Sequence, residues 1–104
     1  MDNSQLSDSA FQIVSFAGDA RSAAMEAINV AKAGNVAAAK EKINDARETI
    51  SEAHHHQTDL ISAEANGEEL PFSVLLIHAQ DHLMTAMTVI DLAEEIVELY
   101  DRIK

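Results

Sequence analysis

Apolar residues recur at spacings of three and four along three long stretches of the chain, and this period predicts three helices. The clearest run is in the middle of the sequence, where one seam comprises Val36, Ala39, Ile43, Ala46, Ile50, Ala53, Gln57 and Leu60. We expect a helix over residues 36–65, with mixed charges on its other faces. Gly34 and Asn35 before it, and Asn66 and Gly67 after it, are typical of a helix end and a helix cap.

A first helix is expected over roughly residues 8–33, with Ser7 or Ser9 as its cap and a ragged segment before it. Its apolar face comprises Phe11, Val14, Phe16, Ala17, Ala20, Ala24, Ala27 and Ala31, and most of these residues are small. Because small side chains reduce the distance between helix axes, this face predicts close packing.

A third helix is expected from Pro71 or Ser73 to near Ile103, and it has more than one apolar stripe. The stripe that we expect to pack against the other helices comprises Leu75, His78, His82, Thr85, Val89, Leu92, Ile96, Leu99 and Ile103. Leu76, Leu83, Met87, Ile90 and Val97 lie on one flank, and Val74, Ile77, Asp81, Met84 and Thr88 lie on the other. Two neighbouring helices cannot cover so much apolar surface, so we expect a homo-oligomer formed through this helix.

Three long helices joined by short turns predict an all-α, antiparallel up-down-up three-helix bundle, with residues 1–104 forming one domain. Three glycines and one proline in 104 residues agree with a helical chain. The absence of cysteine excludes disulfides, thiolate zinc sites and a thiol nucleophile.

The charge distribution indicates which partners to expect. A net charge of −11 with only seven lysines and arginines argues against nucleic acid and favours basic partners. No apolar run is long enough to span a membrane, and the amino-terminal residues do not resemble a signal peptide. We therefore expect a cytoplasmic protein.

The candidate chemistry is concentrated in the third helix. His78 and His82 lie about 40° apart on one helical face, and Asp81 lies about 60° to the other side of His78. Such a histidine pair can bind one transition metal, with Asp81 unsuited to the same ion, or a neutral imidazole can attack phosphorus. The run His54 to His56 resembles a metal tag, but consecutive helical residues point about 100° apart, which favours a surface role.

The segment EAHHHQTDLISAEANGEELPFSVLLIHAQDHLMTAM resembles the enzyme IIA component of the lactose/cellobiose class, including N,N′-diacetylchitobiose, of the bacterial phosphoenolpyruvate-dependent sugar phosphotransferase system. The resemblance extends from FQIVSFAGDARS to ELYDRIK, and HAQDHLMT is its specific motif. In that family the first histidine of the motif accepts a phosphoryl group from the phosphocarrier HPr and passes it to a cysteine of the IIB component. His78 occupies that position.

The resemblance also implies a homotrimer of three-helix subunits in which the aspartate of the motif, here Asp81, meets its copies around a metal ion, commonly Mg²⁺. His82 is then expected to orient His78 or the phosphoryl group, and Gln80 is a weaker candidate for the same task. The HAQDH form, rather than HGQDH, favours a cellobiose or chitobiose system over a lactose system. Such a phosphotransferase works with a membrane IIC permease without inserting into the membrane itself.

A second function remains open at this point. His78, His82 and Asp81 can instead be structural ligands of a non-catalytic, metal-dependent helical oligomer.

Overall fold

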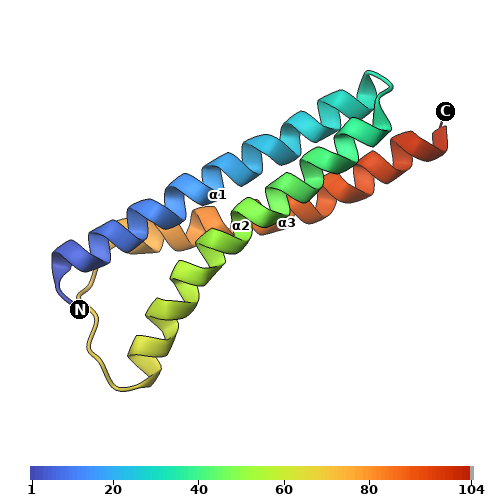
Figure 1. Cartoon of the computed structure of the whole chain (residues 1–104). Coiled ribbons are helices and arrows are strands. Elements are labelled where there is room, and N and C mark those ends of the chain that lie inside the picture. Colours follow the sequence, from blue (N-terminus) through green and yellow to red (C-terminus); the bar gives the residue numbers. More distant parts are fainter. Residues whose placement is uncertain (104) are drawn as a thin grey trace.

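The structure, a computed structural model, describes residues 1–103 and consists of three antiparallel helices (Figure 1). They are α1 (Asn3–Lys32), α2 (Val36–Ala65) and α3 (Val74–Ile103), each 30 residues long. No strand is present between residues 1 and 103. The bundle measures 53 × 20 × 16 Å. These features confirm the all-α, up-down-up three-helix bundle.

α1 begins earlier than residue 8, so the predicted start was wrong. The side chain of Asp2 accepts a hydrogen bond from the Gln5 amide at 2.8 Å, and the Gln5 side chain accepts one from the Asp2 amide at 2.9 Å. This reciprocal capping box satisfies two amides that a helix start leaves without partners. An Asp and a Gln three residues apart are the sequence signal for it, and they outweigh Ser7 and Ser9.

The other helix ends agree with the sequence. Asn35 caps α2 by accepting a hydrogen bond from the Ala38 amide at 3.1 Å. Gly34 has a φ of 104°, a left-handed conformation that residues with a Cβ seldom adopt. Ser73 rather than Pro71 caps α3, since its hydroxyl accepts a hydrogen bond from the Leu76 amide at 3.0 Å.

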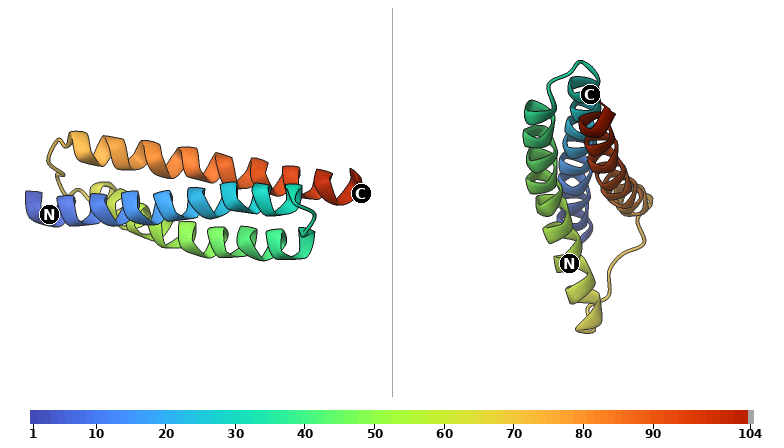
Figure 2. Two further views of the ribbon diagram at one scale, coloured as in Figure 1. Left: turned by 90° about the horizontal axis from the view of Figure 1, so that it is seen from above. Right: turned by 90° about the vertical axis from the view of Figure 1, so that its right-hand side faces the viewer.

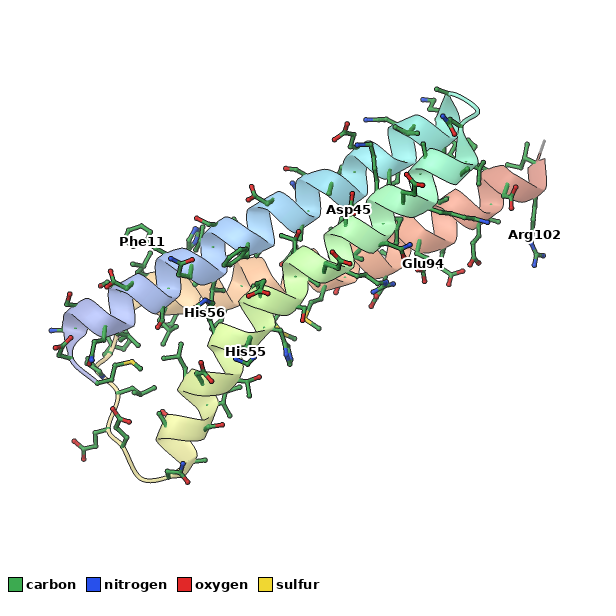
Figure 3. The ribbon with its side chains drawn as sticks, in the orientation of Figure 1. Phe11, Asp45, His55, His56, Glu94 and Arg102 are labelled. Carbon is green, nitrogen blue, oxygen red and sulfur yellow. The ribbon has the colours of Figure 1, made fainter. Side chains whose placement is uncertain are left out.

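The buried face of α1 follows a regular repeat of mostly small residues, Leu6, Ala10, Ile13, Ala17, Ala20, Ala24, Ala27 and Ala31. Phe11 was predicted on this face, but it is 60% exposed and points outward from α1 (Figure 3). The repeat begins at Leu6, and its phase leaves no buried position for Phe11. α1 packs extensively against both other helices, whereas α2 and α3 contact each other less (Figure 2).

The packing seam of α3 also differs from the prediction. The residues that face α1 and α2 are Leu76, Ala79, Leu83, Ala86, Ile90, Ala93 and Val97. The predicted stripe through the histidines lies to one side, with His78 exposed and Leu92 58% exposed. Three alanines complete the true repeat, and their small size lets α3 approach the alanine-rich α1.

The face of α3 opposite this seam is apolar and uncovered. Val74, Ile77 and Met84 are 70%, 58% and 55% exposed, and Asp81 is exposed among them. We call this surface the outer face of α3. It confirms that one apolar stripe of α3 faces solvent in a single chain.

The bundle opens at one end. The second half of α2 turns away from α3, and residues 66–73 cross the gap (Figure 1). The core accordingly forms two clusters along the bundle, and Ile50 of α2 packs against both. Over residues 1–103, no helix combines the length and the apolar character that crossing a membrane requires.

Candidate functional site

The two motif histidines form a pair on α3. Nε2 of His78 and Nε2 of His82 are 3.0 Å apart, with ring centroids 4.5 Å apart and ring planes at 75°. The rings meet because residues four apart lie one above the other on a helix. His78 is exposed and His82 is half-buried. The structure therefore brings the two predicted residues together and leaves His78 accessible to a partner.

The distance between the two nitrogens constrains their protonation. A neutral imidazole has one N–H donor and one acceptor nitrogen, whereas a protonated imidazole has only donors. A hydrogen bond across 3.0 Å thus requires one Nε2 to carry the proton and the other to be free. The pair can present a nitrogen lone pair next to an N–H group, which suits attack on phosphorus followed by contact with a phosphoryl oxygen.

Asp81 lies on the outer face of α3, away from this pair. Within residues 1–103, no three histidine, cysteine or acidic side chains come close enough to hold a metal ion together. A carboxylate suits a hard cation such as Mg²⁺. Among residues 1–103, Asp81 is the carboxylate that lies between Ile77 and Met84 on this face, so a magnesium site with several protein ligands here would need the Asp81 side chains of several copies.

Gln80 faces a different direction from the histidines. Its side-chain oxygen accepts a hydrogen bond from Nε2 of Gln57 on α2, and both side chains are partly buried. Residues two apart on a helix point about 160° apart, so Gln80 and His78 lie on nearly opposite sides of α3. The structure does not bring Gln80 to the histidine pair. The sequence signal for its contact was Gln57, the one amide in an apolar seam.

The run His54 to His56 is spread over several directions, as expected for consecutive helical residues. The ring of His56 stacks on Phe16 of α1, with centroids 6.2 Å apart and planes 17° apart. His54 borders a shallow groove with Arg47, Ile50, Ser51 and Met87. Figure 3 shows His55 and His56 on the second half of α2. The three side chains do not form a metal site with one another.

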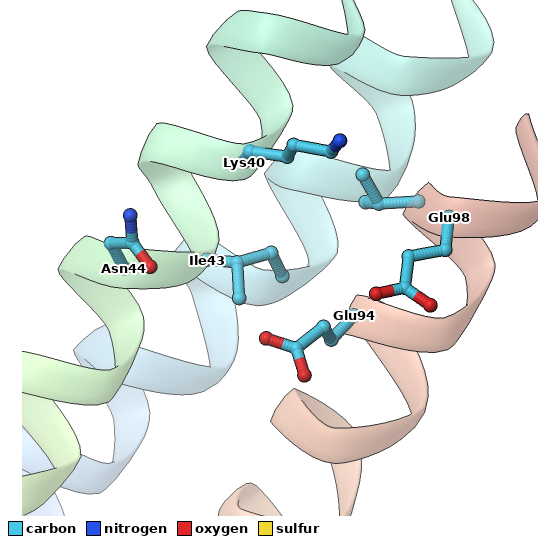
Figure 4. A pocket seen from close by; sticks show the side chains of 6 residues that line it. Lys40, Ile43, Asn44, Glu94 and Glu98 are labelled. Carbon is cyan, nitrogen blue, oxygen red and sulfur yellow. The ribbon is translucent and has the colours of Figure 1, made fainter. Parts of the chain in front are cut away.

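A second hollow lies between α2 and α3 toward the other end of the bundle, lined by Lys40, Ile43, Asn44, Glu94, Val97 and Glu98 (Figure 4). It is about 24 Å from His78 along α3, since Glu94 is 16 residues further on at about 1.5 Å each. The Lys40 ammonium pairs with Asp101 at 3.4 Å. This ion pair links α2 to α3 beside the hollow.

Arg47 makes a further polar link between these helices. Its guanidinium lies 3.1 Å from Asp91 and 3.2 Å from Glu94. The hydrogen bond to Glu94 is the main reason that the pKa of Arg47 is raised, with a smaller effect from Asp91. The arginine remains charged and is occupied by these two carboxylates.

Comparisons with known proteins agree on one family. The family described as "PTS system, Lactose/Cellobiose specific IIA subunit" matches residues 8–101. The chain is 52% identical to the lichenan-specific phosphotransferase enzyme IIA component of Bacillus subtilis over 101 residues, covering 97% of this chain and 92% of that protein.

Solved structures give the same result. The cellobiose-specific enzyme IIA of Bacillus anthracis superposes with a TM-score of 0.92 at 50% identity, covering 99% of this chain and 93% of that one. The chitobiose IIA protein of Escherichia coli, solved in complex with HPr, gives a TM-score of 0.82 at 38% identity, covering 94% of this chain and 95% of that one.

Proposed function

The chain belongs to the lactose/cellobiose-specific IIA family of the phosphotransferase system, and from this membership we propose that it carries a phosphoryl group on His78. The donor is phospho-HPr, and the acceptor is a cysteine of the IIB component. The observation that carries the proposal is the exposed His78 imidazole, paired through its Nε2 with His82. The complex of the chitobiose IIA protein with HPr supports the choice of donor.

The histidine pair supplies a nucleophile and a stabilising donor. With the proton on Nε2 of His82, the lone pair on Nε2 of His78 accepts a hydrogen bond from that N–H group until the donor arrives. The N–H group then turns to a phosphoryl oxygen, and the freed lone pair attacks the phosphorus in line. The new N–P bond forms as the bond between phosphorus and the donor breaks, and a proton from the His78 ring replaces the phosphoryl group on the donor. Transfer to the IIB cysteine reverses this, breaking the N–P bond and forming an S–P bond.

His82 then has a second task. Its Nε2–H group, 3.0 Å from the attacking nitrogen, can donate a hydrogen bond to an oxygen of the bound phosphoryl group. A donor fixed in advance at the position where charge develops contributes a factor of about 10 to 1,000 in rate. His82 is thus the orienting and stabilising residue of the pair.

For the assembly, we propose a homotrimer formed through the outer face of α3. Burial of half-exposed side chains such as Ile77 and Met84 favours association. The three Asp81 carboxylates would meet near the axis and hold one Mg²⁺, which supplies the positive charge that relieves their repulsion.

For the substrate, we propose a β-linked disaccharide of the cellobiose or chitobiose type. The support is the HAQDH form of the motif together with relatives named for lichenan and cellobiose. The protein would work in the cytoplasm, beside a membrane IIC permease that moves the sugar.

The test is the intact mass after incubation with phosphoenolpyruvate, enzyme I and HPr. The wild type should gain about 80 Da, labile in acid and stable in base, as a phosphohistidine is. His78→Ala should gain nothing, whereas His55→Ala, a matched change at an exposed histidine of α2, should gain the full mass. A full gain in His78→Ala would contradict the assignment. A wild type that gains no mass but changes its oligomeric state with metal would favour a metal-dependent scaffold instead.

A further inference from the structure

The amide of Gln57 occupies a position where the rest of the α2 seam is apolar. Ala53 and Leu60, one turn to either side, are 0% and 2% exposed. Gln57 itself is partly buried, and its Nε2 donates to the side-chain oxygen of Gln80 on α3. A single polar residue in a packing seam costs stability but fixes how the two helices align. A glutamine at this position therefore indicates a role other than packing.

The partner of Gln57 lies in the turn of α3 that carries the histidine pair. Gln80 is between His78 and His82 in the sequence but points to the opposite side of the helix. Its neighbours Ala79 and Leu83 are both fully buried in the same core cluster as Ala53 and Leu60. The hydrogen bond between the two side-chain amides therefore holds this turn of α3 on its buried side, while His78 is exposed on the opposite side.

This end of α3 has little other polar support from α2. The ion pairs of Lys40 with Asp101 and of Arg47 with Asp91 and Glu94 join the two helices beyond residue 90. Toward its carboxyl end, α2 turns away from the start of α3 and leaves the gap that residues 66–73 cross (Figure 1). Apolar contacts alone tolerate small rotations, since they have no preferred direction.

We propose that Gln57 is a positioning residue for phosphoryl transfer: its hydrogen bond to Gln80 sets the rotation of the first turns of α3 and so the direction in which His78 meets the phosphoryl donor. The inference rests on the proposed role of His78. The magnitude is sufficient, because a rotation of about 10° moves a side-chain tip 5 to 6 Å from the helix axis by about 1 Å. A displacement of about 1 Å can slow a reaction by about 100-fold.

Three variants separate positioning from stability. Gln57→Leu leaves the Gln80 amide without its partner and should lower both stability and rate. The double variant Gln57→Leu with Gln80→Leu replaces the pair by apolar side chains, which should restore the urea midpoint. Its transfer rate should nevertheless stay about 10- to 100-fold below wild type. Gln57→Glu keeps a hydrogen bond, with the Gln80 amide turned to donate, and should keep the rate within about threefold.

Two further measurements identify the cause. The loss of transfer rate should appear in kcat, with KM for HPr unchanged, because both glutamines lie on the side of α3 away from the exposed His78. The ¹⁵N shifts of the two histidine rings, recorded without any donor, should change in Gln57→Leu and in the double variant but not in Gln57→Glu. Gln12→Leu, a change at an exposed glutamine of α1, should alter neither the rate nor the shifts.

The outcomes are distinguishable. A double variant with wild-type rate and wild-type ring shifts would show that the amide pair serves stability alone. If Gln80→Leu is slow while Gln57→Leu transfers at the wild-type rate, Gln80 acts directly on the phosphoryl group and the inference is wrong. If the wild type itself accepts no phosphoryl group, the proposed function fails first, and the ring shifts alone then report whether Gln57 sets the rotation of α3.

Discussion

Asp81 lies on the outer face of α3 between Ile77 and Met84, which are 58% and 55% exposed. Replacing it by leucine would join these side chains into one apolar surface. Within a single chain the change should alter the free energy of unfolding by no more than about 0.5 kcal/mol, because the position is exposed. A larger effect requires that this face is buried between copies.

In the proposed trimer the effect is large. Two carboxylates about 5 Å apart repel by roughly 3 kcal/mol at an effective dielectric constant of about 20, so three pairs disfavour assembly by about 10 kcal/mol. A bound Mg²⁺ offsets this repulsion. Replacing a buried charged cluster by apolar side chains is often neutral or stabilises by about 1 to 4 kcal/mol. Asp81→Leu should therefore form a trimer and melt above the metal-stripped wild type, with no response to magnesium.

The assay is sedimentation and thermal melting of both proteins, with chelator and with added magnesium. Asp59→Leu, at an exposed carboxylate on α2, is the control and should respond to magnesium as the wild type does. Asp81→Leu should still accept a phosphoryl group, since His82 rather than Asp81 is the partner of His78. A monomeric Asp81→Leu, or a wild type whose melting is indifferent to chelator, would show that this carboxylate does not lie at a shared axis.

Three further predictions concern other parts of the molecule. His82→Ala should keep the oligomeric state but slow transfer by about 10- to 1,000-fold in rapid-quench measurements, and unchanged rates would reduce His82 to a packing role. Association with HPr should slow as salt rises from about 50 to 500 mM, because a chain of net charge −11 attracts a basic partner. An association rate that does not change with salt would show that electrostatic attraction does not contribute. Gly18→Ala should raise the free energy of unfolding by about 0.5 to 1 kcal/mol in urea titration, since Gly18 is inside α1 and an added Cβ would meet nothing within 4 Å. A loss of stability would indicate that another chain approaches this position.

Helix number, order and most helix ends could be predicted because their signals are local. The bounds of α2 follow from Gly34 and Asn35 on one side and Asn66 and Gly67 on the other, and the structure has the helix over the predicted residues. The start of α1 was missed since Asp2 and Gln5 precede the first conspicuous apolar residue. There the capping pair, rather than apolar spacing, determines where the helix begins.

The rotation of α3 about its axis was predicted wrongly because alanine was given too little weight. Leu75, Leu92 and Leu99 made the histidine stripe look like the packing seam, but Ala79, Ala86 and Ala93 are the residues that are fully buried. Small residues decide burial by letting backbones approach, which a count of large side chains overlooks. Since the seam lies elsewhere, His78 is exposed instead of packed, as the proposed transfer between two partners requires.

Contacts between α2 and α3 could not be derived from the sequence in the same way. Gln57 was identified as part of a seam, but its partner depends on the relative rotation and axial shift of two helices that meet only after folding. The same holds for the stacking of His56 on Phe16. Periodicity gives the face on which a residue lies; it does not give the residue opposite.

The charges of α3 are divided in a way that bears on phosphoryl transfer. Between residues 74 and 90 the ionisable side chains are His78, Asp81 and His82, whereas five carboxylates follow between residues 91 and 101. The first of these, Asp91, is 13 residues from His78, or about 20 Å along the helix. That is more than two Debye lengths of about 8 Å at physiological salt, so a phosphoryl group on His78 would experience little of their repulsion. The acidic half of α3 can thus attract those basic side chains of a donor that come within about one Debye length of it, without opposing the negative charge of a phosphoryl group on His78.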